Sequence, residues 1–212
     1  MKMNQVVALP FGGGNKFSFN KFKINITTME YNRDSHSLIE CLVNEIIKIN
    51  GQYYLYGHSM GALLAYLVCH KLQEENLFMP EKLIVSGKKA PSIPREKKIA
   101  HLPDEEFWNE IIALGGIPNE MLNYPELIDY YLPILRYDFK FVESYQYERK
   151  TKLNIPIDVF YGSEEATMAD MIGWREETTE EVIITKLSGD HFFIHDHVEY
   201  FKKYFNNLIY VN

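Results

Sequence analysis

The fold is decided by the stretch Tyr53-Tyr54-Leu55-Tyr56-Gly57-His58-Ser59-Met60-Gly61-Ala62-Leu63-Leu64-Ala65-Tyr66-Leu67-Val68. An apolar run typical of a buried strand passes through a glycine-flanked serine directly into an apolar helical pattern. A serine on so sharp a turn needs a backbone that side chains would crowd, and Gly57 and Gly61 leave the necessary room. The stretch therefore predicts a nucleophile elbow, which presents Ser59 for attack and directs the N–H of Met60 toward a developing oxyanion.

Length and composition limit the class of protein. The chain has 212 residues, 46% of them hydrophobic, which is enough for one sizeable core and a small insertion. Its formal net charge of -7 argues against general affinity for nucleic acid or anionic membrane. Cys41 and Cys69 fall in apolar helical patterns, which favours core packing over a disulfide. Because no apolar stretch is long enough for a membrane span, we expect a cytoplasmic protein. We also expect it to be a monomer.

Short apolar runs separated by helical patterns predict a mostly parallel, doubly wound α/β sheet. The expected strands are residues 5–9, 23–29, 53–56, 82–87, 155–162 and 181–187. A helix that opens at Ser37, with Glu40 as its capping partner, precedes the elbow and carries a wide apolar stripe.

Residues 90–152 interrupt this alternation, because they contain no strand pattern. They hold helix-like pieces at 104–114, 126–136 and 138–147. We therefore expect a core built from residues 1–89 and 153–212, with 90–152 as a helical lid insertion. Such an insertion would lie above the carboxyl ends of the strands, where α/β sheets bind their ligands.

A serine hydroxyl needs a base to accept its proton, and the segment after the last strand offers histidines. His191 is the predicted base, because it follows that strand directly in a glycine-containing loop, whereas His195 and His197 are expected at the opening of a final helix at 198–208. The same cluster could be interpreted as a metal site, but the elbow already accounts for His191, and we expect no metal. His58, inside the elbow, is a lesser candidate.

The acid that orients the histidine is expected in the loop after the strand that ends at Gly162. That loop has no aspartate in its first turn, and Glu165 is the first choice, followed by Glu164 and Asp170. The loop after the first strand reads Pro10-Phe11-Gly12-Gly13-Gly14. Its accessible amides predict that the N–H of Phe11 or Gly12 completes an oxyanion hole with Met60.

These motifs together resemble the type II, or external, thioesterases of nonribosomal peptide and polyketide synthesis. The resemblance is carried by Leu9-Pro10-Phe11-Gly12-Gly13-Gly14, Gly57-His58-Ser59-Met60-Gly61-Ala62, Val85-Ser86-Gly87-Lys88-Lys89-Ala90-Pro91, Leu114-Gly115-Gly116-Ile117-Pro118, Leu132-Pro133-Ile134-Leu135-Arg136-Tyr137-Asp138-Phe139 and Gly189-Asp190-His191-Phe192-Phe193. It implies the α/β-hydrolase fold and a triad of Ser59, His191 and Glu165, in which Glu165 occupies the family's aspartate position.

The resemblance also implies a substrate and a partner. Members of this family hydrolyse acyl or aminoacyl groups from the phosphopantetheine arm of an acyl or peptidyl carrier protein, for editing or release, and need no other cofactor. A cluster of cations in this acidic chain could be a solvated face or, as we hypothesise, a docking surface for an acidic carrier. The cluster consists of Lys88, Lys89, Arg95, Lys97 and Lys98.

Two other functions fit the same sequence. One is a small-molecule carboxylesterase of the same fold, since a fold alone does not define a substrate. The other is a catalytically weak homologue that binds carrier proteins without turning substrate over. Acylation of Ser59 in a single turnover would separate this binding protein from both enzymes.

Overall fold

The computed structural model describes residues 4–33, 35, 37–117, 121 and 123–210. A six-stranded sheet forms the centre, with the strand order β2-β1-β3-β4-β5-β6, and every neighbouring pair is parallel. The strands are β1 (Gln5–Leu9), β2 (Ile26–Thr28), β3 (Tyr53–His58), β4 (Leu83–Ser86), β5 (Ile157–Gly162) and β6 (Val182–Leu187). The predicted parallel α/β sheet is confirmed.

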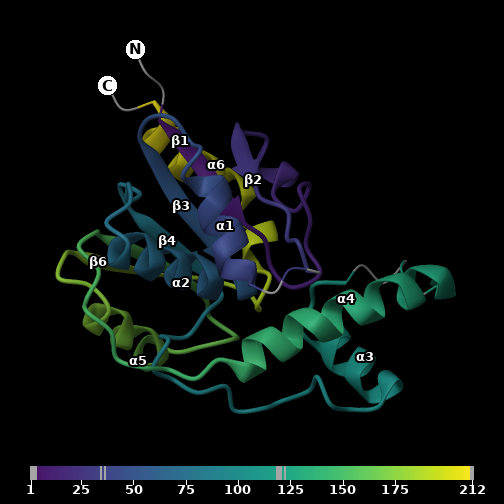
Figure 1. The fold of residues 1–212 in the computed structure, drawn as a ribbon. Coiled ribbons are helices and arrows are strands. Elements are labelled where there is room, and N and C mark those ends of the chain that lie inside the picture. The colour runs from purple at the N-terminus through teal and green to yellow at the C-terminus, as the bar shows by residue number, and fades with distance from the viewer. Residues whose placement is uncertain (1–3, 34, 36, 118–120, 122, 211–212) are drawn as a thin grey trace.

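Helices cover both faces of this sheet (Figure 1). Helices α1 (Leu38–Ile46) and α2 (Met60–Glu74) pack on one face, and α6 (Val198–Ile209) packs on the other. The strands divide their side chains accordingly, because successive residues point to opposite faces. In β1, for example, Val7 belongs to the core under α1 and α2, whereas Val6 belongs to the core under α6. The elbow strand β3 is therefore buried on both sides, as its unbroken apolar run predicted.

Local signals explain several element boundaries. Ser37 caps α1 as predicted, since its hydroxyl accepts the N–H of Glu40 at 3.3 Å. Strand β2 is shorter than the predicted 23–29, because the chain first forms a 3-10 helix, η1 (Asn20–Phe22), and then passes through Lys23 in the left-handed region with φ of 52°. Both cysteines are free. Among the described residues, no helix is long and apolar enough to cross a membrane.

Segment 90–152 contains α3 (Asp104–Ala113) and α4 (Pro125–Ser144). The expectation of two pieces at 126–136 and 138–147 is wrong, because α4 is one helix of 20 residues that passes through Pro133. An uninterrupted apolar stripe at helical spacing holds it together across that proline. The stripe consists of Ile128, Leu132, Leu135, Phe139 and Val142.

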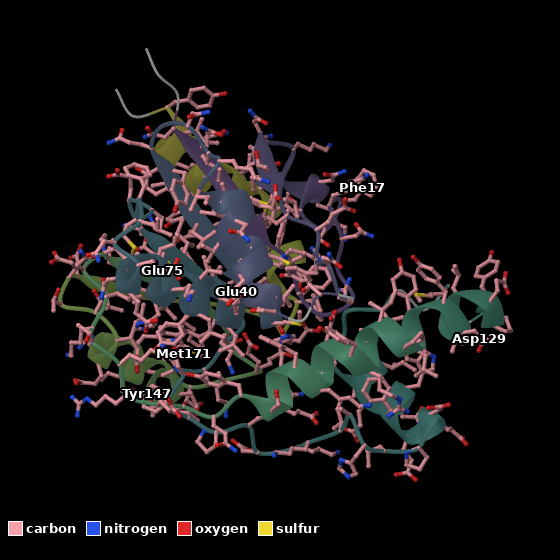
Figure 2. All side chains as sticks on the ribbon, in the orientation of Figure 1. Phe17, Glu40, Glu75, Asp129, Tyr147 and Met171 are labelled. Atoms are coloured by element: carbon pink, nitrogen blue, oxygen red, sulfur yellow. The ribbon has the colours of Figure 1, made fainter. Side chains whose placement is uncertain are left out.

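The two helices of this segment share a small apolar core that is separate from the two cores of the sheet. Its buried members are Ile99, Phe107, Trp108, Ile111 and Leu135. Figure 1 shows α4 running past the sheet so that its amino-terminal part extends beyond the rest of the fold. In Figure 2, Asp129 marks this outer end, whereas Tyr147, just past the other end, lies next to the body. Residues 118–120 and 122, which the predicted lid includes, lie outside the described residues.

Candidate active site

Ser59 stands on the turn between β3 and α2 with φ of 57° and ψ of -116°. A non-glycine residue at positive φ is strained, and such strain is typical of a functional turn. The two flanking glycines are required by close backbone contacts. A Cβ at Gly57 would lie 2.2 Å from the carbonyl oxygen of Gly61, and a Cβ at Gly61 would lie 1.9 Å from that of Leu9. The local sequence thus produces the predicted elbow.

The structure brings Ser59, His191 and Glu165 into one hydrogen-bonded chain. His191 Nε2 lies 2.8 Å from Ser59 Oγ, and His191 Nδ1 lies 2.6 Å from Glu165 Oε2. The other carboxylate oxygen, Oε1, accepts the N–H of Gly162 at 3.0 Å, so both oxygens of Glu165 are held. With Nδ1–H donated to Glu165, Nε2 is free to take the proton of Ser59.

The other two candidate acids are placed elsewhere. Glu164 is exposed, and its backbone N–H donates to the carbonyl of Gly189 at 2.9 Å. Asp170 caps α5 (Met168–Ile172) through Thr167, and it also forms an ion pair with Lys89 at 3.2 Å. Among the three carboxylates considered from the sequence, the geometry therefore favours Glu165.

A second serine and histidine lie buried next to the hydrogen-bonded chain of Ser59, His191 and Glu165. His58 Nδ1 lies 2.8 Å from Ser86 Oγ, which also bonds the hydroxyl of Tyr56 at 2.9 Å. His58 is 0% exposed and Ser86 is 1% exposed, so substrate does not reach this pair. Burial, and then the neighbouring His191, keep the pKa of His58 well below its usual value. The sequence analysis missed Ser86, although its place at the end of a buried strand next to the elbow was a usable signal.

The other two histidines of the predicted cluster, His195 and His197, do not join the hydrogen-bonded chain of Ser59, His191 and Glu165. His195 ends a 3-10 helix, η4 (Phe193–His195), and its ring stacks on that of Phe192 at 5.9 Å. His197 Nε2 lies 2.9 Å from the carbonyl oxygen of Ser188. Within the described parts of the chain, no group of three or more histidine, cysteine or acidic side chains could hold a metal ion.

Next to Ser59 lies a small cavity of about 50 Å³. Phe11 and Gly12 line it from the loop after β1, so the expected second arm of the oxyanion hole lies beside the nucleophile. Met60 is the first residue of α2, and its N–H therefore has no acceptor within its own helix. The rest of the wall is apolar and comes largely from segment 90–152. These residues are Ile111, Leu114, Ile117, Leu135 and Phe139.

Two side chains that the sequence analysis did not single out hold the loop at residues 10–14. The hydroxyl of Tyr31 donates to the carbonyl oxygen of Pro10 at 2.5 Å, and Asp138 accepts the N–H of Gly13 at 2.7 Å. Asp138 comes from α4, so the loop is fixed by a helix that is distant in sequence. No local pattern around residue 138 would have revealed this contact.

The five candidate docking cations have different surroundings. Lys89 is paired with Glu96 at 2.9 Å and with Asp170, and Lys97 is paired with Glu110 at 2.5 Å. The guanidinium of Arg95 lies over the ring of Phe139, 5.1 Å from its centroid. Two of the five cations, Lys89 and Lys97, are thus paired with neighbouring carboxylates.

Four members of the cluster line a cavity of about 330 Å³ that Glu165 and His191 also line. They are Lys88, Lys89, Arg95 and Lys97. Burial, followed by the charges of Arg95 and Lys89, lowers the pKa of Lys88 to about 8. Lys88, Arg95 and Lys98 also line a neighbouring cavity of about 460 Å³.

A serine elbow, a histidine and a carboxylate on a parallel sheet define the class of the α/β hydrolases, and solved structures of this fold superpose on 98% of the chain. Residues 4–207 match the family model described as the thioesterase domain. The chain therefore belongs to the thioesterase family.

Individual relatives agree with this assignment. The gramicidin S biosynthesis protein GrsT of Aneurinibacillus migulanus is 36% identical over 163 residues, which cover 75% of this chain and 64% of that protein. The chain thus spans less than two thirds of the length of GrsT. ClbQ from the colibactin NRPS/PKS pathway has 26% identity and a TM-score of 0.88, and the match covers 98% of this chain and 97% of ClbQ.

A second solved structure carries the family name directly. The type II thioesterase BorB from the borrelidin biosynthetic cluster has 25% identity and a TM-score of 0.83, and the match covers 98% of this chain and 93% of BorB. The resemblance to type II thioesterases that the sequence motifs indicated is confirmed.

Proposed function

We propose that this chain is a serine thioesterase that hydrolyses acyl or aminoacyl thioesters on the phosphopantetheine arm of a carrier protein, for editing or release in nonribosomal peptide or polyketide synthesis. One observation carries the proposal: Ser59, His191 and Glu165 form a continuous hydrogen-bonded chain beside an apolar cavity. Membership of the thioesterase family supports the choice of a thioester as the substrate.

In the first half of the reaction, Ser59 Oγ attacks the thioester carbonyl and His191 Nε2 takes the hydroxyl proton. The N–H of Met60 and that of Phe11 or Gly12 stabilise the oxyanion, and Glu165 stabilises the imidazolium through Nδ1–H. The tetrahedral intermediate then expels the thiol, which receives the proton from His191. An acyl-enzyme on Ser59 remains.

In the second half, His191 removes a proton from a water molecule that attacks the acyl-enzyme. A second tetrahedral intermediate forms in the same oxyanion hole and releases the acid, while His191 returns the proton to Ser59 Oγ. The atoms balance, because one thioester and one water give one thiol and one acid. No cofactor takes part in these steps.

Segment 90–152 serves as the lid of this site and supplies the apolar wall for the acyl group. The observation that supports this role is the cavity next to Ser59, in which five side chains of the segment face the nucleophile. Enclosure of the acyl group would exclude bulk water from the oxyanion hole, where a low dielectric strengthens the hydrogen bonds.

The partner is an acidic carrier protein, and the cation cluster provides its docking surface. Lys88 and Arg95 are its central members, because each lines both the cavity that leads to His191 and the neighbouring cavity of about 460 Å³. Lys89 and Lys97 already have carboxylate partners, so their contribution to the field outside the protein is smaller.

The function is tested with a panel of acyl-loaded carrier proteins, free acyl thioesters and matching oxygen esters, with thiol or acid release read by mass. We expect turnover of carrier-bound thioesters by the wild type and none by Ser59→Ala. A fluorophosphonate probe should label the wild type and Ser86→Ala, in which the buried second serine is removed, and should not label Ser59→Ala.

The same panel separates the alternatives. A preference for oxygen esters would identify a carboxylesterase, and carrier binding without acylation of Ser59 would identify a binding protein. Labelling that survives in Ser59→Ala would show that the nucleophile lies elsewhere.

A further inference from the structure

The loop at residues 10–14 is held at both ends by buried side chains. At its start, the hydroxyl of Tyr31 donates to the carbonyl oxygen of Pro10 at 2.5 Å. Near its end, Asp138 Oδ2 accepts the N–H of Gly13 at 2.7 Å. Phe11 and Gly12, whose amides are the candidates for the oxyanion hole, lie between these two anchors. Their orientation therefore depends on the two side chains.

Asp138 is a fully buried carboxylate whose two oxygens are both engaged. It is 0% exposed. Oδ1 accepts from Nε of Arg33 at 2.7 Å, and Oδ2 accepts from Nη2 of Arg33 at 2.6 Å in addition to the N–H of Gly13. A bidentate pair of this kind fixes the plane of the carboxylate as well as its position. The N–H of Gly13 thus meets a rigid acceptor.

Arg33 is held on its other side. Its guanidinium lies over the ring of Tyr31, 5.4 Å from the centroid, and Tyr31 is the residue that anchors Pro10. The two anchors of the loop are therefore parts of one connected cluster, which consists of Tyr31, Arg33 and Asp138. The cluster joins the segment after β2 to the middle of α4.

The loop needs such an anchor because its glycines are conformationally free. Gly13 adopts φ of 75°, and without a contact that fixes it the glycine backbone could take other conformations. An oxyanion hole is effective when its donors are already oriented, since reorganisation at the moment of reaction is costly. A misplacement of about 1 Å in a reacting geometry costs roughly 10²-fold in rate.

We propose that Asp138 is a positioning residue for the oxyanion hole: it fixes the peptide at Phe11 and Gly12 through Gly13, and its own plane is set by Arg33. The lid helix α4 therefore contributes to catalysis as well as to the walls of the cavity. This inference rests on the proposed function, because an oxyanion hole has a role only if Ser59 attacks a carbonyl.

The test compares Asp138→Asn with Asp158→Asn. Asp158 is a matched control, since it is also a buried carboxylate, paired with Lys82 at 3.0 Å, but it lies near the start of β5, away from Ser59. In Asp138→Asn one of the two acceptor oxygens becomes an NH₂ group, which faces either Arg33 Nε or both Arg33 Nη2 and the N–H of Gly13, so the bidentate pair that sets the plane of the side chain is lost. On a short soluble thioester, Asp138→Asn should lower kcat roughly 10- to 100-fold and change KM less than about threefold.

Two further measurements do not depend on turnover. The affinity of an alkyl boronic acid, which forms a tetrahedral adduct on Ser59, should fall by a factor similar to that in kcat. Hydrogen exchange in the peptide that covers residues 10–14 should become faster in Asp138→Asn and remain unchanged in Asp158→Asn. If Asp138→Asn fails to fold, Arg33→Lys provides the milder test, because it keeps the positive charge but loses the bidentate geometry, and kcat should fall less.

The outcomes separate this inference from the proposed function. A wild type that hydrolyses no thioester would refute the proposed function. An active wild type with equal kcat in Asp138→Asn and Asp158→Asn would overturn the inference. A rise in KM with unchanged kcat would also overturn it, since Asp138 would then support the acyl cavity and not the oxyanion hole.

Discussion

The carboxylate of Glu165 is held by a second hydrogen bond in addition to its contact with His191. One oxygen bonds His191 Nδ1 at 2.6 Å and the other accepts the N–H of Gly162 at 3.0 Å. The backbone N–H of Glu165 also donates to the carbonyl of Gly162 at 3.3 Å, which turns the chain back toward the end of β5. The tight turn thus holds both the backbone and the carboxylate of Glu165 at the end of β5, where the longer side chain reaches His191.

We predict that Glu165→Gln lowers kcat by roughly 10³- to 10⁴-fold, because the amide cannot stabilise the imidazolium and favours the wrong tautomer of His191. Steady-state turnover of a carrier-bound thioester measures the loss. Glu164→Gln is the matched control, since this exposed neighbour should retain the wild-type rate. If Glu165→Gln retains that rate and Asp170→Asn does not, the acid is Asp170; if all three variants are active, the enzyme works as a dyad.

Single residues were predictable where the chemistry leaves a local trace. Ser59 was predicted from its flanking glycines, and His191 and Glu165 were predicted from their places after two strands. The pair of Asp138 and Arg33 was not predictable, because its members are 105 positions apart and each lies in a segment that has another explanation. Contacts of this kind depend on how α4 packs against the loop after β1, and a single sequence does not specify this packing.

At the scale of elements, α4 contributes side chains both to the cavity beside Ser59 and to the loop at residues 10–14. Leu135 and Phe139 line the cavity beside Ser59, and Asp138 between them anchors Gly13. The break that the sequence analysis placed near residue 137 is absent because the apolar stripe continues through it. The type of each element was therefore predictable from periodicity, whereas the length of α4 depends on its packing against α3 and the loop at residues 10–14.

Leu135 lines two cavities. One, beside Ser59, has a volume of about 50 Å³, and the other, lined also by Phe17 and Tyr131, has about 250 Å³. Phe11, Gly12, Gly116, Ile117 and Leu135 line both, so the cavities adjoin one another. The inner cavity has room for roughly three to five water-sized groups. We therefore expect the wild type to prefer short acyl groups.

We predict that Leu135→Ala joins the two cavities and shifts the preference of the enzyme toward longer acyl groups. Values of kcat/KM across an acyl series from two to twelve carbons measure the shift, and the wild type should decline beyond about four carbons. Truncating this buried leucine also costs about 2 to 5 kcal/mol of stability, so melting temperature is recorded alongside. An unchanged chain-length profile would show that the acyl group leaves the site by another route.

At the scale of the whole molecule, charge is distributed unevenly. The chain has a formal net charge of -7, yet five cations lie between residues 88 and 98, and Lys88 among them faces the cavity that reaches His191. An acidic carrier would be repelled by the average field of the protein and attracted by this one region. Composition predicted the acidic average, but the carboxylates that balance Lys89 and Lys97 come from Asp170 and Glu110, and only the fold shows these pairs.

We predict that Lys88→Gln raises KM for a carrier-bound thioester at low salt and leaves a small soluble thioester unaffected. The control is Lys48→Gln, which removes an exposed cation, paired with Glu45 at 2.6 Å, near the start of β1 at the opposite end of the sheet. Added salt should reduce the wild-type advantage of the carrier substrate, since exposed charges are screened beyond about 8 to 10 Å at physiological ionic strength. An equal loss on both substrates would show that Lys88 supports the catalytic site itself.

The same lysine should make docking depend on pH. Because burial lowers the pKa of Lys88 to about 8, its charge is present at pH 7 and is lost as the pH rises through 8. The ratio of kcat/KM for the carrier substrate to that for the small thioester should therefore fall between pH 7 and 9, and taking the ratio cancels the pH dependence of the chemical steps. Lys88→Arg keeps its charge throughout this range, so its ratio should stay level. A wild-type ratio that is also level across this range would mean that the charge of Lys88 does not contribute to carrier docking.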